Sequence, residues 1–196
     1  MTDTMEKEID LEEVKAAVDT LKAGGLILYP TDTVWGIGCD ATNEAAVAKV
    51  FALKQRSDSK SLITLVADAD MLGKYVKVIP EVAINLLEVN DKPMTIIYPG
   101  AMGLAPGVVA EDGSAGIRIP MNDFCVEVIR RFRKPIVSTS ANISGEPSPK
   151  AFADIPAEIR SAVDYVVAPR LERESTGLAS QIIKLGLDGE VEIIRR

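Results

Sequence analysis

The chain has 196 residues, of which 47% are hydrophobic and 26% charged, the balance of one globular domain with a substantial core. Its net charge of −7 argues against a protein that coats nucleic acid non-specifically, because such binding depends on neutralising phosphates. The sequence contains no histidine, which excludes the commonest general base and the commonest neutral metal ligand.

Nothing in the sequence points to export or to a membrane. The longest apolar stretches, such as residues 25–29, fall far short of the roughly 20 residues that cross a bilayer. The first ten residues are polar and acidic, unlike a secretory signal. Cys39 and Cys125 lie far apart without a CxxC pair, which disfavours a disulfide framework or a zinc site. We therefore expect a cytoplasmic protein that does not enter a membrane.

The N-terminal quarter predicts two helices around one strand. Asp10 and the glutamate three residues later form a capping-box pattern, which opens a helix that runs to about Lys22. The apolar residues 26–29 predict a buried strand, and residues 31–40 a loop. Thr42 is expected to cap the second helix.

Helices and strands continue to alternate, and the C-terminal end is rich in strands. Further strands are predicted at 62–66, 94–98, 116–120, 135–138, 163–167, 180–185 and 191–194. Further helices are predicted after Asp68, from Pro80 through Leu87, and over 123–132. The pattern predicts an α/β fold, an open twisted mixed sheet flanked by helices in a single domain over 1–196, and leaves the strand order open.

Three polar loops follow buried strands or helices, and strand ends are where ligands usually bind in open α/β sheets. The first loop spans residues 30–38. The hydroxyls of Thr31 and Thr33 can donate and accept hydrogen bonds, and Gly36 and Gly38 allow a ligand to approach the backbone. The alternative is a plain turn in which Asp32 satisfies local N–H groups.

The second loop, residues 54–61, carries three cations within seven residues, namely Lys54, Arg56 and Lys60. Such a group can hold a polyphosphate, because arginine offers a bidentate fork and lysine a point charge. The alternative is a solvated helix end whose cations complement the helix dipole. A GxxxxGK[ST] pattern is absent, so this is not a P-loop protein.

The third loop, residues 138–145, contains four hydroxyls and one amide. Hydroxyls and exposed N–H groups in such a loop form an anion-binding nest, and the alternative is an ordinary turn. A serine hydrolase is disfavoured because the sequence has neither a GxSxG elbow nor a histidine.

Three other features allow two interpretations each. Arg118 lies in an apolar strand, so it either faces solvent or is held by an anionic partner. Trp35 either stacks on a base or packs in the core. The basic residues 130–134 are expected to be a solvated helix end, with a contact to RNA as the alternative.

The order and spacing of these segments resemble the YrdC-like family of threonylcarbamoyl-AMP synthases, from about Gly24 to Arg195. The matching motifs are Pro-Thr-Asp-Thr-Val-Trp-Gly, then Lys-x-Arg, then an arginine in a short strand, then Ser-x-Asn-x-Ser-Gly. The resemblance implies a fold with a concave ligand groove. It implies that L-threonine, bicarbonate and Mg-ATP become threonylcarbamoyl-AMP and pyrophosphate, and that a separate protein complex transfers the threonylcarbamoyl group to tRNA.

The resemblance also implies roles for individual residues. Those expected at the threonine substrate are Thr33, Arg118, which would hold the carboxylate, and Ser180. Those expected at ATP are Lys54, Arg56, Lys60, Ser138, Ser140, Asn142, Ser148 and Arg195. Catalysis would rest on Lys54, Arg56, Ser140 and Asn142. Mg²⁺ would arrive with ATP, and the sequence indicates no protein ligand for a metal.

The sequence departs from the family pattern at Ser57, Leu65 and Gln181, where relatives often have proline, histidine and threonine. Two alternatives therefore stay open. One is a protein of the same fold that binds RNA or a nucleotide without turnover. The other is a related enzyme for another small acid or carbamoyl donor, which Leu65 and Gln181 would support if they line the pocket.

Overall fold

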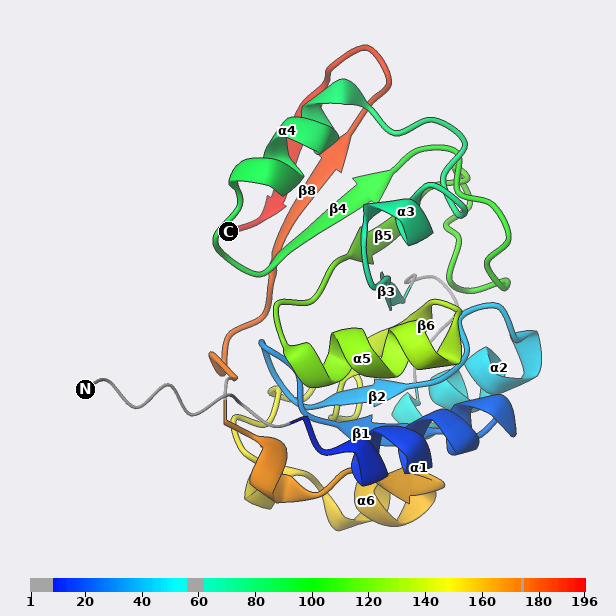
Figure 1. Ribbon diagram of the computed structural model, residues 1–196, viewed down its shortest axis with the longest axis vertical. Coiled ribbons are helices and arrows are strands. Elements are labelled where there is room, and N and C mark those ends of the chain that lie inside the picture. The colour runs from blue at the N-terminus through cyan, green and yellow to red at the C-terminus, as the bar shows by residue number, and fades with distance from the viewer. Residues whose placement is uncertain (1–8, 56–61, 174) are drawn as a thin grey trace.

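The computed structural model describes residues 9–55, 62–173 and 175–196. Within these ranges nine strands form one sheet in the order β7-β1-β2-β6-β3-β5-β4-β8-β9 (Figure 1). The strands are β1 (Ile27–Tyr29), β2 (Gly36–Gly38), β3 (Ile63–Leu65), β4 (Met94–Tyr98), β5 (Ala115–Arg118), β6 (Ile136–Ser140), β7 (Tyr165–Val166), β8 (Gln181–Leu185) and β9 (Val191–Arg195). The pairs β1–β7, β3–β5 and β4–β8 are parallel and the other pairs antiparallel, which confirms the predicted mixed sheet.

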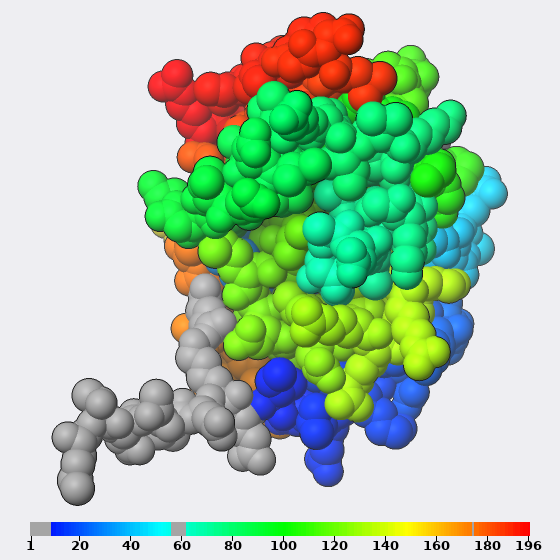
Figure 2. All heavy atoms as spheres, turned by 45° about the horizontal axis from the view of Figure 1, so that its top comes forward, coloured from blue at the N-terminus to red at the C-terminus, as the bar shows by residue number. Residues whose placement is uncertain are grey.

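Helices cover both faces of one half of the sheet and one face of the other half. They are α1 (Leu11–Lys22), α2 (Glu44–Lys54), α3 (Ala69–Leu72), α4 (Glu81–Val89), α5 (Asp123–Phe132) and α6 (Ala157–Ala162), with 3-10 turns η1 (Phe152–Asp154) and η2 (Pro169–Leu171). Apolar residues of α1 and α5 share one core with β1, and those of α2 and α6 another. Figure 2 shows a face formed by α1 in blue, α5 in yellow-green and the green segment with α3 and α4. In the described ranges, no helix has the length and apolar character of a membrane span.

In the half of the sheet that α3 and α4 cover, the opposite face is free for a ligand. Successive side chains of a strand point to opposite faces. On β4 and β8, Ile96 and Ile183 contact the core under α3 and α4. Their neighbours Thr95 and Ile182 therefore point to the other face, where Ile182 lines a cleft. This free face positions the candidate site described below.

The first helix begins as predicted, although only half of the capping box forms. Asp10 Oδ1 accepts a hydrogen bond from the Glu13 backbone N at 3.1 Å. The Glu13 carboxylate does not close the box; it accepts from Tyr165 Oη at 2.7 Å and from Ala168 N at 3.0 Å. The residue expected to complete a local cap instead fastens α1 to the segment at β7.

The second helix begins one residue later than predicted. Asn43 is its cap, and its side-chain oxygen accepts from Ala46 N at 3.1 Å. Thr42 cannot act as the cap because Asp40 Oδ1 takes both its backbone N, at 2.8 Å, and its hydroxyl, at 2.6 Å. The carboxylate two residues upstream therefore outcompetes the helix for the threonine side chain.

The first polar loop contains a strand that the sequence did not predict. Two of the three residues of β2 are Gly36 and Gly38, which hide its strand character because glycine is a weak strand former. A Cβ at Gly38 would lie 2.7 Å from the Tyr29 ring and 3.0 Å from the Val137 carbonyl oxygen. The space beside Gly38 therefore holds Tyr29, and the expectation that this glycine admits a ligand is wrong.

The third polar loop and the segment that follows it also differ from the prediction. The strand β6 continues through Thr139 and Ser140, so it ends two residues later than predicted. Pairing of these residues with β2, Gly36 with Ser140 and Ile37 with Thr139, extends the strand. Helix α6 was not predicted, because a six-residue helix with one buried side chain, Ile159, has too little apolar periodicity.

Candidate functional site

A cleft of about 260 Å³ opens on the free face of the sheet, at the ends of several strands. Seven of the residues assigned to substrates from the sequence line this one cleft: Thr33, Arg118, Ser138, Ser140, Ser148, Ser180 and Arg195. Ile63 and Ile182 add apolar wall between the hydroxyls and the guanidinium groups. The fold therefore joins residues that are up to 162 positions apart in the sequence.

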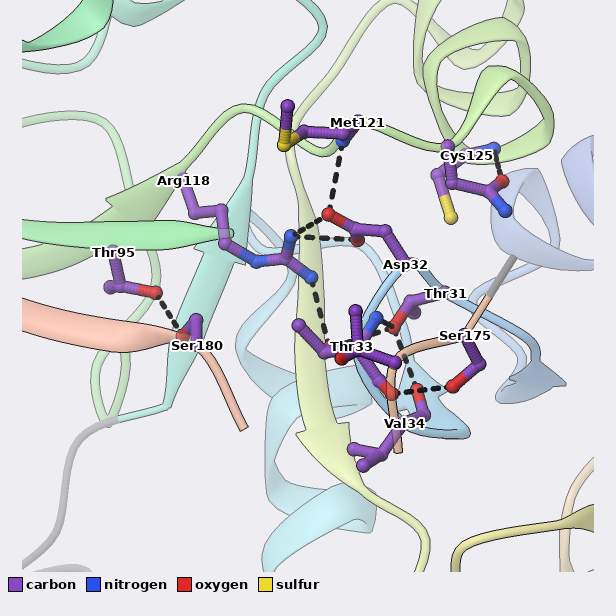
Figure 3. Close-up of polar contacts among 12 residues, drawn as sticks. Thr31, Asp32, Thr33, Val34, Thr95, Arg118, Met121, Cys125, Ser175 and Ser180 are labelled. Atoms are coloured by element: carbon purple, nitrogen blue, oxygen red, sulfur yellow. Dashed lines mark hydrogen bonds and ion pairs between the residues drawn. The ribbon is translucent and has the colours of Figure 1, made fainter. Parts of the chain in front are cut away.

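The centre of the site is a buried ion pair between Arg118 and Asp32 (Figure 3). Arg118 Nη1 donates to both carboxylate oxygens of Asp32 at 2.7 Å, and Met121 N donates to Asp32 Oδ2 at 3.1 Å. The two residues are only 4% and 5% exposed. Of the two interpretations of Arg118, an anionic partner is confirmed. The pairing fixes one side of the guanidinium and leaves Arg118 on the cleft wall.

Three hydroxyl and backbone contacts organise the loop between β1 and β2. Thr31 Oγ1 donates to the Val34 carbonyl oxygen at 2.7 Å, accepts from Thr33 N at 3.0 Å, and lies 2.9 Å from Thr33 Oγ1. Arg118 Nη2 donates to Thr33 Oγ1 at 3.3 Å. Thr33, which lines the cleft, therefore has its hydroxyl between a buried threonine and the guanidinium.

The segment 175–177, called the strap here, holds this loop from the outside. Ser175 Oγ and Gly177 N both donate to the Thr33 carbonyl oxygen, the latter at 2.8 Å. Thr176 N donates to the Asp32 carbonyl oxygen at 3.0 Å. Because the strap leads directly into β8, it ties the loop after β1 to the strand on the far side of the cleft.

On that far side, Ser180 is part of a second small network. Its hydroxyl lies 2.8 Å from Thr95 Oγ1, and Arg195 donates through Nε to the Ser180 carbonyl oxygen at 2.9 Å. Arg195 Nη2 lies 3.4 Å from the Ser180 hydroxyl. The two residues that the sequence assigned to different substrates, Ser180 and Arg195, are therefore direct neighbours.

Lys54 and Asn142 are not among the residues that line the cleft. Lys54 is 2% exposed, and its ammonium donates to the carbonyl oxygens of Ser140, at 2.5 Å, and Asn142, at 2.8 Å. It also contacts Asn142 Oδ1 at 3.3 Å. Lys54 thus braces the loop that follows β6. Its contact with a phosphate stays a prediction, and it would require the ammonium to exchange these carbonyls for the ligand.

We expect Lys54→Met to destabilise the protein by about 2–4 kcal/mol, because it leaves buried loop carbonyls without a donor. Hydrogen exchange of residues 141–146 should accelerate, and the midpoint of thermal unfolding should fall. The control is Lys49→Met, an exposed lysine on the same helix. Equal behaviour of the two variants would contradict the bracing role.

Most hydrogen-bonding groups of the loop after β6 are paired within the protein. Ser140 Oγ donates to Asn142 Oδ1 at 2.5 Å, and Asn142 Nδ2 donates to the Glu146 carbonyl oxygen at 2.6 Å. The backbone N–H groups of Ala141, Asn142, Ser144 and Glu146 all donate to protein carbonyls. The predicted nest of exposed N–H groups is therefore wrong at these four positions, and of the predicted loop Ser138, Thr139 and Ser140 line the cleft.

Five residues named in the sequence analysis are absent from the described lining of the cleft. Arg56, Ser57 and Lys60 fall outside the described residues. Leu65 is fully buried in the core with α1 and α5, and Gln181 is exposed at the start of β8. Neither residue lines the cleft, so neither supports the alternative of a related enzyme for another small acid.

Trp35 packs in the core and does not face the cleft. It is fully buried among residues of α2 and α6, with its ring 5.0 Å from that of Phe152. Of its two interpretations, packing is confirmed. The basic helix end also pairs within the protein, because Arg131 contacts Glu127 and Lys134 contacts Asp40.

Burial keeps Tyr29 and Cys125, two ionisable residues of the core, protonated near neutral pH. Burial raises the pKa of Tyr29, whose hydroxyl donates to the Val137 carbonyl oxygen at 3.2 Å. Burial, with the Asp32 charge adding to it, raises the pKa of the Cys125 thiol, which donates to the Pro30 carbonyl oxygen. These groups support the walls, and the cleft acts on a ligand through hydroxyls and guanidinium groups.

Thr95 and Ser175 were not named from the sequence, Thr31 was named only for its hydroxyl in the first polar loop, and Asp32 only as part of a plain turn. Asp32 had a usable signal, since a buried arginine requires a carboxylate and Asp32 is the acidic residue of the matching motif. Thr95 and Ser175 had none, because single hydroxyls are common on strands and turns. Their importance follows only from the contacts that the fold creates.

The chain is similar to proteins of one family. The family described as "Telomere recombination", which groups Sua5, YciO and YrdC, matches residues 19–196. The threonylcarbamoyl-AMP synthase of Stenotrophomonas maltophilia is 35% identical over 189 residues, which cover 94% of this chain and 98% of the relative. P. abyssi Sua5 complexed with L-threonine superposes with a TM-score of 0.84 at 27% identity. The match covers 91% of this chain and 52% of Sua5, so the chain spans about half of Sua5. E. coli YciO shares the fold, with a TM-score of 0.78 at 22% identity over 94% of this chain and 89% of YciO.

Proposed function

The chain belongs to the Sua5/YciO/YrdC family, as the motif spacing predicted, and on this premise we propose that it is a threonylcarbamoyl-AMP synthase. It converts L-threonine, bicarbonate and ATP to threonylcarbamoyl-AMP and pyrophosphate. The observation that carries the proposal is the convergence of seven residues, chosen from the sequence alone, on one cleft.

The cleft wall carries groups that suit both substrates. Arg118 and Thr33 offer a cation and a hydroxyl 3.3 Å apart, which suits the carboxylate and the α-nitrogen of an amino acid. Ser140, Ser148 and Arg195 line other parts of the wall and are proposed to contact the nucleotide. Sua5 in complex with L-threonine supports a threonine site in this fold.

The reaction requires positioning more than proton transfer. L-Threonine and bicarbonate form a carbamate with loss of water, and a carbamate oxygen then attacks the α-phosphate of ATP while pyrophosphate leaves. Fixed donors and charges are the main protein contribution to such a transfer. A chain without histidine can therefore carry it out.

Magnesium is proposed to enter as Mg-ATP. Within the described ranges, no three or more histidine, cysteine, aspartate or glutamate side chains gather in a group that could hold a metal ion. Mg²⁺ commonly keeps several waters and binds through substrate phosphates, so the residues present fit an ion that the nucleotide brings. It neutralises phosphate charge as part of that substrate.

The direct test is pyrophosphate release from ATP and Mg²⁺, measured with and without L-threonine and bicarbonate. We expect release only when both are present, with a threonylcarbamoyl adenylate detected by mass spectrometry. ATP binding without threonine-dependent release would support a nucleotide-binding protein. Salt-dependent binding of tRNA without release would support an RNA-binding one.

The product and the setting extend the same proposal. An acyl adenylate is an activated donor, and we propose that a tRNA-modifying protein complex consumes it to form threonylcarbamoyladenosine. A cytoplasmic location agrees with ATP as substrate and with Cys39 and Cys125, which are both free and buried.

A further inference from the structure

Thr31 is a buried threonine behind the cleft wall, and its hydroxyl has three neighbours (Figure 3). It is 1% exposed and does not line the cleft. A hydroxyl has one proton to donate and two lone pairs to accept with. The contacts of Thr31 with Val34 and Thr33 use its proton and both of its lone pairs.

The direction of each hydrogen bond follows from this count. The Val34 carbonyl oxygen can only accept, so the single proton of Thr31 points to it at 2.7 Å. In the 2.9 Å contact between the two hydroxyls, Thr33 must therefore be the donor. The only proton of Thr33 is thus directed away from the cleft, towards Thr31.

The lone pairs of Thr33 are consequently what a ligand meets. One accepts from Arg118 Nη2 at 3.3 Å, and the other remains for the cleft that Thr33 lines. The strap holds the Thr33 carbonyl oxygen through Ser175 and Gly177, which fixes the loop in this arrangement. The site accordingly presents an acceptor directly beside a cation.

We propose that Thr31 is a positioning residue that fixes Thr33 as a hydrogen-bond acceptor, and so selects ligands with a donor on the carbon next to their carboxylate. This inference rests on the proposed function and deepens it, because an α-amino acid is such a ligand. Once the α-ammonium has released one proton to solvent, an acceptor-only Thr33 holds an N–H of the neutral amine and leaves the nitrogen lone pair free to attack the carbon of bicarbonate, whose hydroxide leaves as water with a proton from the nitrogen. A donating Thr33 would occupy that lone pair.

The test compares two ligands that differ in donor ability but have the same charge. L-2-Hydroxybutanoate carries a donor on its α-carbon, and 2-oxobutanoate carries only an acceptor there. We expect the wild-type protein to bind the hydroxy acid at least roughly tenfold more tightly in calorimetric titrations, because the oxo acid leaves two acceptors facing each other. In Thr31→Val, Thr33 is free to donate, and the ratio should fall to about two or less.

Thr31→Ser is the matched control, since it keeps the hydroxyl and should keep the wild-type ratio. If Thr31 had only a structural role, Thr31→Val would lower the affinity for both ligands by the same factor. The ratio of the two affinities would then be unchanged, which would overturn the proposal. A wild-type ratio near one, or no binding of the hydroxy acid to the wild type, would overturn it without any variant. Because these titrations need no turnover, a failure of threonine-dependent pyrophosphate release is scored separately and concerns the proposed function.

Discussion

Replacing Arg118 by glutamine should reduce kcat/KM for L-threonine by roughly three orders of magnitude, or about 4 kcal/mol of transition-state stabilisation. The guanidinium lies on the cleft wall beside Thr33, and it is proposed to hold the substrate carboxylate. Most of the loss should fall on KM, because the carboxylate is present in the ground state as well. Steady-state pyrophosphate release with varied threonine measures both constants.

The variant also leaves Asp32 buried without its counter-charge, so a loss of activity alone would not separate binding from folding. The double variant Asp32→Asn with Arg118→Gln removes both charges and should recover much of the stability. Removing both charges of a buried ion pair costs less stability than leaving one charge buried without its partner. Its activity should stay as low as that of the single variant. Recovery of activity in the double variant would contradict a direct role of Arg118. Arg131→Gln, at an exposed arginine, serves as the neutral control.

The sequence predicted the sheet class and most strands because their signals are local. Apolar runs such as β4 and the amphipathic pattern of α5 are visible within ten residues, and both elements have the predicted bounds. The strand β2 was not predicted because glycines hide its strand character, and at Gly38 the ring of Tyr29 from β1 takes the space of a side chain. That contact forms only when the two strands pair, so the local sequence does not reveal it.

The site was predictable as a set of residue types, and its internal pairing was not. An arginine in an apolar strand indicates a counter-ion, but Asp32 lies 86 positions away and only the fold selects it. Lys54 illustrates the opposite limit. A lysine in a basic segment predicts a phosphate contact, while the carbonyls that receive its ammonium belong to a loop after β6. Charge indicates that a partner is needed, and tertiary packing decides which one.

The arrangement explains how a cleft without histidine can be specific. Its polar groups are chiefly hydroxyls and guanidinium groups, which recognise a ligand by hydrogen bonds and charge. Each has a second partner that holds it in place: Asp32 for Arg118, Thr31 for Thr33, and Thr95 for Ser180. A site of this kind relies on preorganisation, because each donor and acceptor is aimed before the ligand arrives.

Asp32→Asn is the most demanding test of this preorganisation. The amide oxygen can still accept from Met121 N, while the substitution removes the negative charge and replaces Oδ1, an acceptor for Arg118, by an NH2 donor. Breaking a buried ion pair on one side costs about 3–5 kcal/mol. For a chain of this length, each kcal/mol lowers the unfolding midpoint by about 2–4 °C, so we expect a decrease of roughly 6–20 °C. Asp188→Asn, at an exposed aspartate of the β8–β9 turn, should change it little.

The same variant distinguishes a structural arginine from a substrate-binding one. In Asp32→Asn the guanidinium is left buried without a carboxylate, and the carboxylate of bound L-threonine can supply the missing charge. Saturating L-threonine should therefore raise the unfolding midpoint more in the variant than in the wild type, since a ligand stabilises the state that binds it. L-Threonine amide, which lacks the carboxylate, should show no such difference. If L-threonine stabilises both proteins equally, its carboxylate does not bind at Arg118, and the threonine site must be assigned to other residues.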